Sequence, residues 1–188
     1  MQVPNNNVSA LRESGAVLQR FVFSVLAIML LCVSAPAQES ETDGLPLPQG
    51  QPILEVQGKI ARANADGAAL FDIEMLKSLP EARLETTTAV TDGVRRFGGF
   101  LMRDLLDLVG AKGATVTASA LNDYVIEFPA DEFERFDVLV AYEMDGKPLL
   151  PNDKGPLWIV YPRDQHSELQ DIRYDYRWVW QLRRLDIE

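Results

Sequence analysis

Three consecutive threonines, Thr86, Thr87 and Thr88, end a predicted strand and stand before a turn and an amphipathic helix. Threonine is common in strands, so the run is compatible with an ordinary strand end. Each hydroxyl can also donate one hydrogen bond and accept others, which is the chemistry needed to hold a polar ligand. The residues alone leave both interpretations open.

Two further segments carry side chains suited to a flat, polar heterocycle. Asn122 and Asp123 stand between two predicted strands. They form either a turn, because both accept left-handed backbone angles and cap their own amides, or a loop that offers an amide and a carboxylate to a ligand. The run LLPNDKGPLWIVYPRD places Trp158 and Tyr161 where loop and strand meet. Such aromatic side chains belong either to the core or to a ligand wall.

Several classes of enzyme site are excluded by composition. His166 is the only histidine and lies in a polar loop, where we expect it to be solvated. A histidine-rich metal site and a histidine-activated nucleophile are therefore excluded. Gly98 and Gly99 have no phosphate-loop motif around them. Trp178 and Trp180, two residues apart, are expected on one strand face, where core packing is favoured. No catalytic or metal-ligating residue is predicted.

The first 37 residues are predicted to be a signal peptide. Arg12 and Arg20 give a basic start, and residues 21–33 form an apolar run. This run is shorter than the roughly 20 residues of a membrane span. Ala35 and Ala37 supply the small residues that a signal peptidase reads. An uncleaved anchor is the alternative, but we expect a periplasmic protein cleaved after Ala37.

Cleavage removes Cys32, the only cysteine. The mature chain then has no disulfide and no thiolate nucleophile. A disulfide-free exported chain suits a periplasm better than a small disulfide-stapled scaffold does. The formal net charge is −10 for the whole chain, and an acidic field of this kind repels nucleic acid and anionic lipid. Nucleic acid is therefore not an expected partner.

The remaining chain is predicted to be a flexible linker over residues 38–52, rich in polar residues, proline and glycine, and one domain over residues 53–188. Strands are expected at 53–61, 82–88, 114–119, 124–128, 137–144, 156–161 and 177–187, with a turn at 91–93. Asp145-Gly146 has the sequence of a tight hairpin turn. The order of elements predicts a strand-rich α+β domain with short helices.

Two helices are clear from the pattern. Asp72 is the expected N-cap of the first, and Pro80 is expected to stop it. The second lies within residues 100–113, where Leu101, Met102, Leu105, Leu106 and Val109 form one apolar stripe and Gly110 provides a C-terminal cap. One further helical turn is expected at residues 131–136.

The order of these segments resembles the oxidoreductase molybdopterin-binding domain, the sulfite-oxidase fold. The resemblance covers residues 53–187 and rests on ILEVQGKI, FGGFLMRDLLDLVGAKGA, NDYVIEFP, VLVAYEMDGKPLLPNDKGPLWIVYP and RWVWQLRRLDI. It implies an α+β, mixed-sheet fold with short helices, built to bind a molybdopterin cofactor.

Two departures from the family pattern concern that cofactor. The resemblance implies a metal-binding cysteine at the end of a strand, in the neighbourhood where this chain has Thr86 to Thr88. A hydroxyl is a hard ligand and does not replace a thiolate on molybdenum. The arginine that follows Gly-x-Pro-Leu in the family is Trp158 here, which removes a cation suited to the phosphate of the cofactor.

The resemblance extends to a cysteine-less, exported branch whose members are periplasmic pterin-binding regulators. It implies a reduced pterin without molybdenum as ligand, and as partner the periplasmic domain of an inner-membrane cyclic di-GMP diguanylate cyclase/phosphodiesterase. The residues expected to hold the pterin are Thr86, Thr87, Thr88, Asn122, Asp123, Tyr124, Trp158, Tyr161 and Arg163. The alternatives are a molybdopterin-dependent oxidoreductase with an atypical metal site, and an assembly factor that binds no small molecule.

Overall fold

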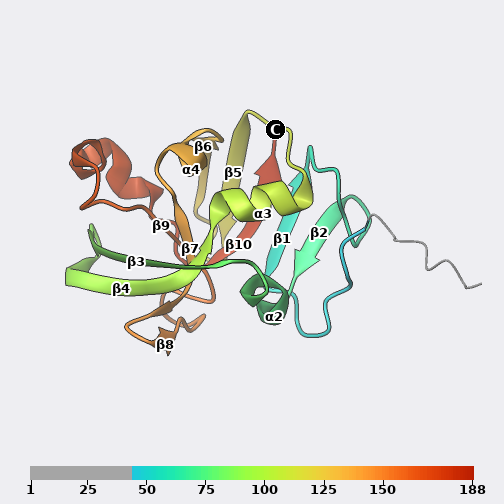
Figure 1. The fold of residues 1–188 in the computed structure, drawn as a ribbon, viewed down its shortest axis with the longest axis horizontal. Helices are drawn as coiled ribbons and strands as arrows, with labels where there is room; N and C mark the ends of the chain where they lie inside the picture. The colour runs from blue at the N-terminus through green and yellow to red at the C-terminus, as the bar shows by residue number, and fades with distance from the viewer. Residues whose placement is uncertain (1–43) are drawn as a thin grey trace, which may run out of the picture. The chain divides into compact units, whose positions relative to one another are not determined.

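The computed structural model describes residues 44–188. The predicted signal peptide and residues 38–43 of the predicted linker lie outside this range. The described chain is built from two five-stranded sheets joined by short helices (Figure 1). Within residues 44–188, no helix is long and apolar enough to cross a membrane.

The first sheet is mixed. Strands β1 and β10 at its centre run parallel, with Val56 opposite Leu185, and every other pair is antiparallel. The buried side chains of β1, Leu54 and Val56, alternate with more exposed ones, so one face of this strand meets the core. In spatial order the strands are β2 (Ala68–Phe71), β1 (Leu54–Gly58), β10 (Leu182–Ile187), β5 (Thr115–Ala120) and β6 (Val125–Pro129).

The second sheet is antiparallel throughout. Its order is β3 (Glu81–Thr88), β4 (Thr91–Leu101), β7 (Leu139–Met144) and β8 (Lys147–Pro148), with β9 (Trp158–Val160) also paired to β7. Asp145 and Gly146 connect β7 to β8 with φ angles of 53° and 73°. The tight turn predicted from the Asp-Gly pair is therefore confirmed.

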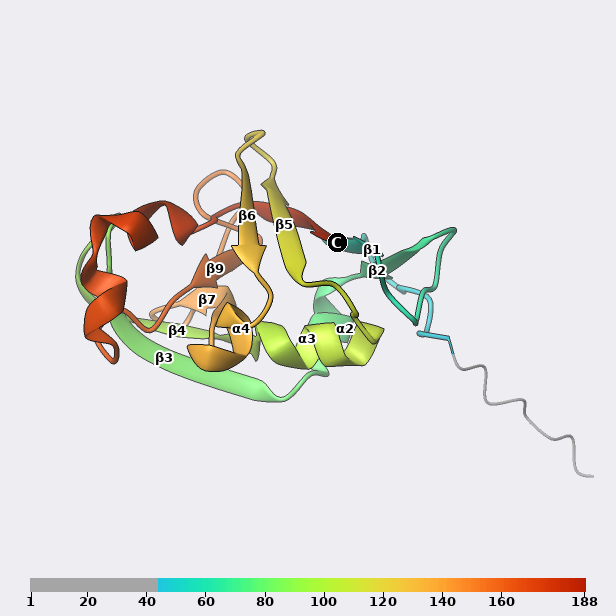
Figure 2. The ribbon, with the colours of Figure 1, turned by 90° about the horizontal axis from the view of Figure 1, so that it is seen from above.

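Both predicted helices are present. In α2 (Ile73–Lys77) the Asp72 side chain accepts the Met75 N–H at 2.9 Å. In α3 (Met102–Val109) the apolar stripe is buried and Gly110 ends the helix in the left-handed conformation. A third helix, α4 (Glu132–Arg135), lies beside α3 (Figure 2) and confirms the helical turn expected there. Two 3₁₀ helices follow, η1 (Ser167–Gln170) and η2 (Ile172–Arg177).

The two glycines of β4 have a packing role. A Cβ atom at Gly99 would stand 2.0 Å from the carbonyl oxygen of Val140, because β4 and β7 approach closely at a β-bulge. At Gly98 a Cβ would meet the Glu143 carboxylate, which lies across the strand. Only glycine fits at Gly99 without moving a backbone. These residues therefore allow close strand packing.

Three local expectations are wrong. The turn expected at residues 91–93 lies at Ala89–Val90, and β4 already begins at Thr91. The hydroxyls of Thr88 and Thr91 bond each other at 2.8 Å across this earlier turn. The strand expected from residue 177 begins only at Leu182. His166 is half-buried, with its ring edge-on to Phe136 at 5.2 Å between centroids.

Asp72 joins the end of the predicted linker to the domain, and this provides a test of the fold. Its carboxylate accepts the Met75 N–H and also the Gln49 and Gly50 N–H groups at 2.8 and 2.7 Å. The bonds from Met75 and then Gly50 are the main reasons that the pKa of Asp72 is lowered. The stability that this carboxylate provides is therefore complete above the unfolded pKa, about 3.9, and is lost as pH falls through the lower folded pKa.

We predict that Asp72→Asn destabilises the protein at pH 7 and that its difference from wild type shrinks as pH falls towards 3. Urea unfolding at a series of pH values measures this difference. Glu74→Gln is the matched control, because Glu74 is exposed and, within residues 44–188, forms an ion pair with Lys77 alone. A difference for Asp72→Asn that stays constant with pH would contradict the assignment.

Candidate functional site

The hydroxyls of the threonine run are bonded to the protein itself. Thr86 is buried, donates to the Thr87 carbonyl and accepts the Asp164 N–H, both at 3.2 Å. Thr88 exchanges a hydrogen bond with Thr91 and accepts the Val90 N–H at 3.1 Å. The hydroxyl hydrogen of Thr86 is therefore already bonded to the neighbouring backbone.

Asp164, which follows β9, binds the middle threonine. Its two carboxylate oxygens accept the Thr87 N–H and the Thr87 hydroxyl, each at 2.6 Å. We call this pair of bonds the Thr87–Asp164 clasp. It joins the end of β3 to the segment after β9. Figures 1 and 2 show the segment that contains η1 and η2 close to the β3–β4 turn. The neighbourhood in which the family pattern expects a metal ligand is thus occupied by hydrogen bonds within the chain.

The loop between β5 and β6 is a turn with one side chain reaching across the molecule. Asp123 has φ 63°, and the Asn122 side chain accepts the Tyr124 N–H at 3.2 Å. These features are those of the predicted turn. The Tyr124 hydroxyl donates to the Tyr176 carbonyl at 2.7 Å, which links this loop to η2. Partial burial, with Tyr176 close by, raises the pKa of Tyr124.

Two of the predicted aromatic residues are in the core. Trp158 is fully buried, with its ring edge-on to Phe97 at 5.4 Å, and its indole N–H has no hydrogen-bond partner among the residues that the structure describes. Tyr161 is also fully buried and donates its hydroxyl to Glu132 at 3.1 Å. Burial raises the pKa of Tyr161 far above its usual value, so this phenol stays neutral.

Arg163 is half-buried and directly precedes Asp164 of the clasp in the sequence. Its N–H donates to the Tyr161 carbonyl at 2.9 Å, and its Nε is buried without a hydrogen-bond partner. Arg163 therefore retains unused donor capacity beside Asp164. It does not line the cavity described next.

A cavity of about 200 Å³ brings together three regions that are distant in sequence. We call it the Trp178 cavity. It lies among the β3–β4 turn, the β5–β6 loop and the segment from η2 to β10. Two predicted site residues, Asn122 and Tyr124, take part. The complete lining is Val90, Asn122, Tyr124, Asp175, Tyr176, Trp178 and Trp180.

The Trp178 cavity offers one unpaired acceptor and one unpaired donor among aromatic walls. Among residues 44–188, neither the buried Asp175 Oδ1 nor the indole Nε1 of Trp178, a residue that is 2 % exposed, has a hydrogen-bond partner. Buried polar groups are nearly always hydrogen-bonded, so two unpaired atoms on residues that line one cavity are candidates to bond a ligand or water there. The arrangement suits a flat molecule with donors on one edge and an acceptor elsewhere.

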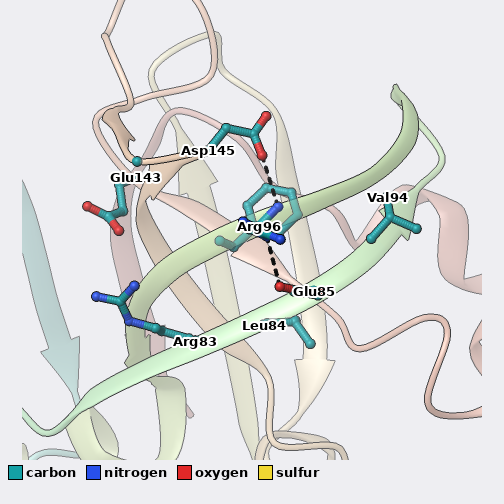
Figure 3. Close-up of a pocket in the computed structure, with 9 residues that line it drawn as sticks. Arg83, Leu84, Glu85, Val94, Arg96, Glu143 and Asp145 are labelled. Atoms are coloured by element: carbon teal, nitrogen blue, oxygen red, sulfur yellow. Dashed lines mark hydrogen bonds and ion pairs between the residues drawn. The ribbon is translucent and has the colours of Figure 1, made fainter.

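A larger hollow of about 780 Å³ lies on the second sheet (Figure 3). Charged side chains of β3, β4, β7 and the β7–β8 turn line it, and all of them except Glu143 form ion pairs within the described residues. Arg96 bonds Glu85 at 2.9 Å, and Arg95 bonds Asp145 at 3.1 Å. The hollow is open and has no buried unpaired acceptor, so the smaller Trp178 cavity is the better candidate for a small-molecule site.

Asp175, Trp178 and Trp180 were not predicted as site residues. The sequence offers one signal for the two tryptophans, a spacing of two residues, and this spacing predicts core packing on one face of a strand. The core packing predicted for this pair is confirmed for Trp178, which is 2 % exposed, and Trp180 packs against the core. Neither residue lies in a strand, because β10 begins only at Leu182, after Gln181 with its φ of 55°. Trp180 instead forms an isolated bridge with Trp158 and turns towards the cavity.

The comparison with known families agrees with the resemblance. Residues 72–166, about half of the chain, match the model of the oxidoreductase molybdopterin binding domain. No curated protein matches the chain. The matched range includes the predicted site residues from Thr86 to Arg163 and ends before η2. Within residues 44–188, no three His, Cys, Asp or Glu side chains are grouped to hold a metal ion.

The Thr87–Asp164 clasp makes a local prediction. Asp164→Ala removes two hydrogen bonds to a carboxylate, and we expect the free energy of unfolding to fall by about 1–2 kcal/mol. The Thr87 amide should lose protection against hydrogen exchange. Asp153→Ala is the control, because Asp153 is exposed and its ion pair in the described part of the chain is with its neighbour Lys154. Unchanged exchange at Thr87 would contradict the clasp.

Proposed function

Because the chain belongs to the oxidoreductase molybdopterin-binding domain family, we propose that it is a periplasmic pterin-binding regulatory protein without catalytic activity. Its ligand is a reduced pterin that carries no molybdenum. Its partner is the periplasmic domain of an inner-membrane diguanylate cyclase/phosphodiesterase, as the resemblance to the cysteine-less exported branch implies.

The observation that carries this proposal is the chemistry of the Trp178 cavity. A pterin has donors at its 2-amino group and N3–H and an acceptor at O4. The unpaired Asp175 Oδ1 can accept from the donor edge, and Trp178 Nε1 can donate to an acceptor. Tyr124, Tyr176 and Trp180 add aromatic wall. The residues therefore fit the bicyclic head group.

The size of the cavity favours a bare pterin over a complete molybdopterin. Sites for drug-sized ligands enclose about 300–1,000 Å³, whereas this cavity encloses about 200 Å³. A fused two-ring head is compatible with the smaller volume, but a tail with phosphate and metal would have to extend outside it. Trp158 replaces the family arginine and is buried against Phe97, so it offers no cation to a phosphate.

The donor set near the threonine run does not fit molybdenum. The available groups there are hydroxyls bonded to protein partners and the carboxylate of Asp164. These are hard oxygen donors, whereas the family uses a thiolate. We therefore derive no chemical step through a metal.

Regulation follows from the origin of the cavity walls. A ligand bonded to Asp175 and in contact with Asn122 and Val90 connects the β3–β4 turn to the β5–β6 loop and η2, which the Tyr124–Tyr176 hydrogen bond already joins to each other. Binding then favours the conformation in which η2, the β5–β6 loop and the β3–β4 turn are held together. A partner that recognises this conformation responds to the pterin without contacting it.

We predict that Asp175→Asn weakens binding of a reduced pterin at least tenfold, because the charge-assisted hydrogen bond it loses is worth about 1.5–3 kcal/mol. Trp178→Phe keeps the ring plane but loses the N–H, and should weaken binding several-fold. Fluorescence titration with tetrahydropterin under anaerobic conditions measures both effects, and thermal melts verify the fold.

Trp158→Phe is the matched control. It removes an unpaired indole N–H in the core that does not line the cavity, so affinity should stay at the wild-type value. Asp123→Ala tests whether the neighbouring turn carboxylate also contacts the ligand. Loss of binding in Trp158→Phe together with normal binding in Asp175→Asn would place the site elsewhere.

A further inference from the structure

Strand β3 forms an open edge of the second sheet. It pairs with β4 on one side only. In the described part of the chain, no backbone hydrogen bond joins Glu81–Thr88 to any segment other than β4. Pro80 stands before the strand and the Thr87–Asp164 clasp occupies its end. A stretch of about six residues therefore presents unpaired backbone groups to solvent.

The backbone contacts identify which residues face outward. Arg96 accepts the Asp145 N–H at 2.7 Å and donates its own N–H to Asp145 Oδ1 at 3.1 Å, so its backbone groups face away from β3. Glu85 is opposite Arg96, and its N–H and C=O must therefore face the open edge. The Thr87 N–H also points outward, to Asp164. By alternation, Arg83 faces the same way.

The side chains beside these outward groups alternate in charge. Arg83 and Glu85 stand on the solvent face of β3, with 74 % and 64 % of their side chains exposed (Figure 3). Each has one exposed partner in its own chain, Glu81 for Arg83 and Arg96 for Glu85. Exposed pairs of this kind contribute little and exchange readily. Both side chains can therefore take a new partner across the edge.

We infer that β3 pairs antiparallel with β3 of a second copy about a two-fold axis at Leu84. Arg83 of each copy then lies opposite Glu85 of the other, and these two residues exchange both backbone hydrogen bonds in each half. The result is four intermolecular hydrogen bonds and two cross-strand ion pairs. The second sheets of the two copies become one continuous sheet.

The charge pattern specifies this register over its neighbours. If the two-fold axis lies at Arg83 instead of Leu84, Arg83 is opposite Arg83 and Glu81 is opposite Glu85. If the axis lies at Glu85, Glu85 is opposite Glu85. Like charges directly opposite each other in a sheet are destabilising. A larger shift, centred on Ala82, pairs Glu81 with Arg83 but leaves Glu85 beyond the paired segment. The charges of Arg83 and Glu85 are self-complementary only in the register centred on Leu84.

Charge-exchange variants of the mature protein test this directly, with sedimentation velocity as the readout. We expect a concentration-dependent dimer for wild type, and a dimer dissociation constant at least tenfold larger for Arg83→Glu and for Glu85→Arg. An equimolar mixture of these two variants should form heterodimers, because each then supplies the charge that the other lacks. The double variant R83E/E85R should restore the homodimer.

Thermal melts of each variant control for folding, and ligand-free protein is used so that the result does not depend on the pterin. Wild-type protein that stays monomeric throughout the micromolar range would overturn the inference. So would a dimer that both single variants leave unchanged, or single variants that do not associate when mixed. Association of the open edge only with an added heterologous strand would assign the edge to another partner and also reject self-pairing.

Discussion

A buried ion pair between Arg177 and Glu132 holds η2, the segment that supplies much of the cavity wall. The two side chains are 19 % and 11 % exposed, and Tyr161 donates its hydroxyl to the same carboxylate oxygen. The guanidinium also lies 4.9 Å from the centre of the Tyr174 ring. Desolvation lowers the pKa of Arg177, but the guanidinium remains charged. Removing one partner of such a pair costs about 3–5 kcal/mol, because the other stays buried. The positions of Asp175 and Tyr176 therefore depend on α4.

The features that the sequence predicted well are those fixed by neighbouring residues. The apolar stripe of α3, the Asp72 cap and the Asp145-Gly146 turn each depend on a few adjacent side chains. Contacts between segments that are distant in the sequence could not be predicted. Asp164 bonds Thr87 across 77 positions, and nothing near either residue marks the other as its partner. For the same reason the predicted site residues are spread over the core, the clasp, the two neighbouring turns and the cavity, and of these residues only Asn122 and Tyr124 line the cavity.

The threonine run and the Trp178 cavity together give a consistent account of a changed family member. Where the family pattern has a soft metal ligand, this chain has threonine hydroxyls. Asp164 accepts hydrogen bonds from the N–H and the hydroxyl of Thr87 there. The cavity beside it keeps aromatic walls and one unpaired carboxylate oxygen. Recognition of a heterocycle needs only the aromatic walls and the unpaired carboxylate oxygen of the cavity, whereas metal chemistry needs a soft ligand such as a thiolate. The proposed function therefore has this chain recognise the head group of the cofactor without the metal.

The most direct test of this account is to measure molybdenum and pterin in the same sample of protein purified from a molybdate-replete host. Elemental analysis gives the metal content, and mass spectrometry of an anaerobic organic extract identifies the ligand. The account predicts a reduced pterin in an amount comparable to the protein, with molybdenum far below stoichiometric. Molybdenum at one atom per chain would contradict it and favour an oxidoreductase with an atypical metal site.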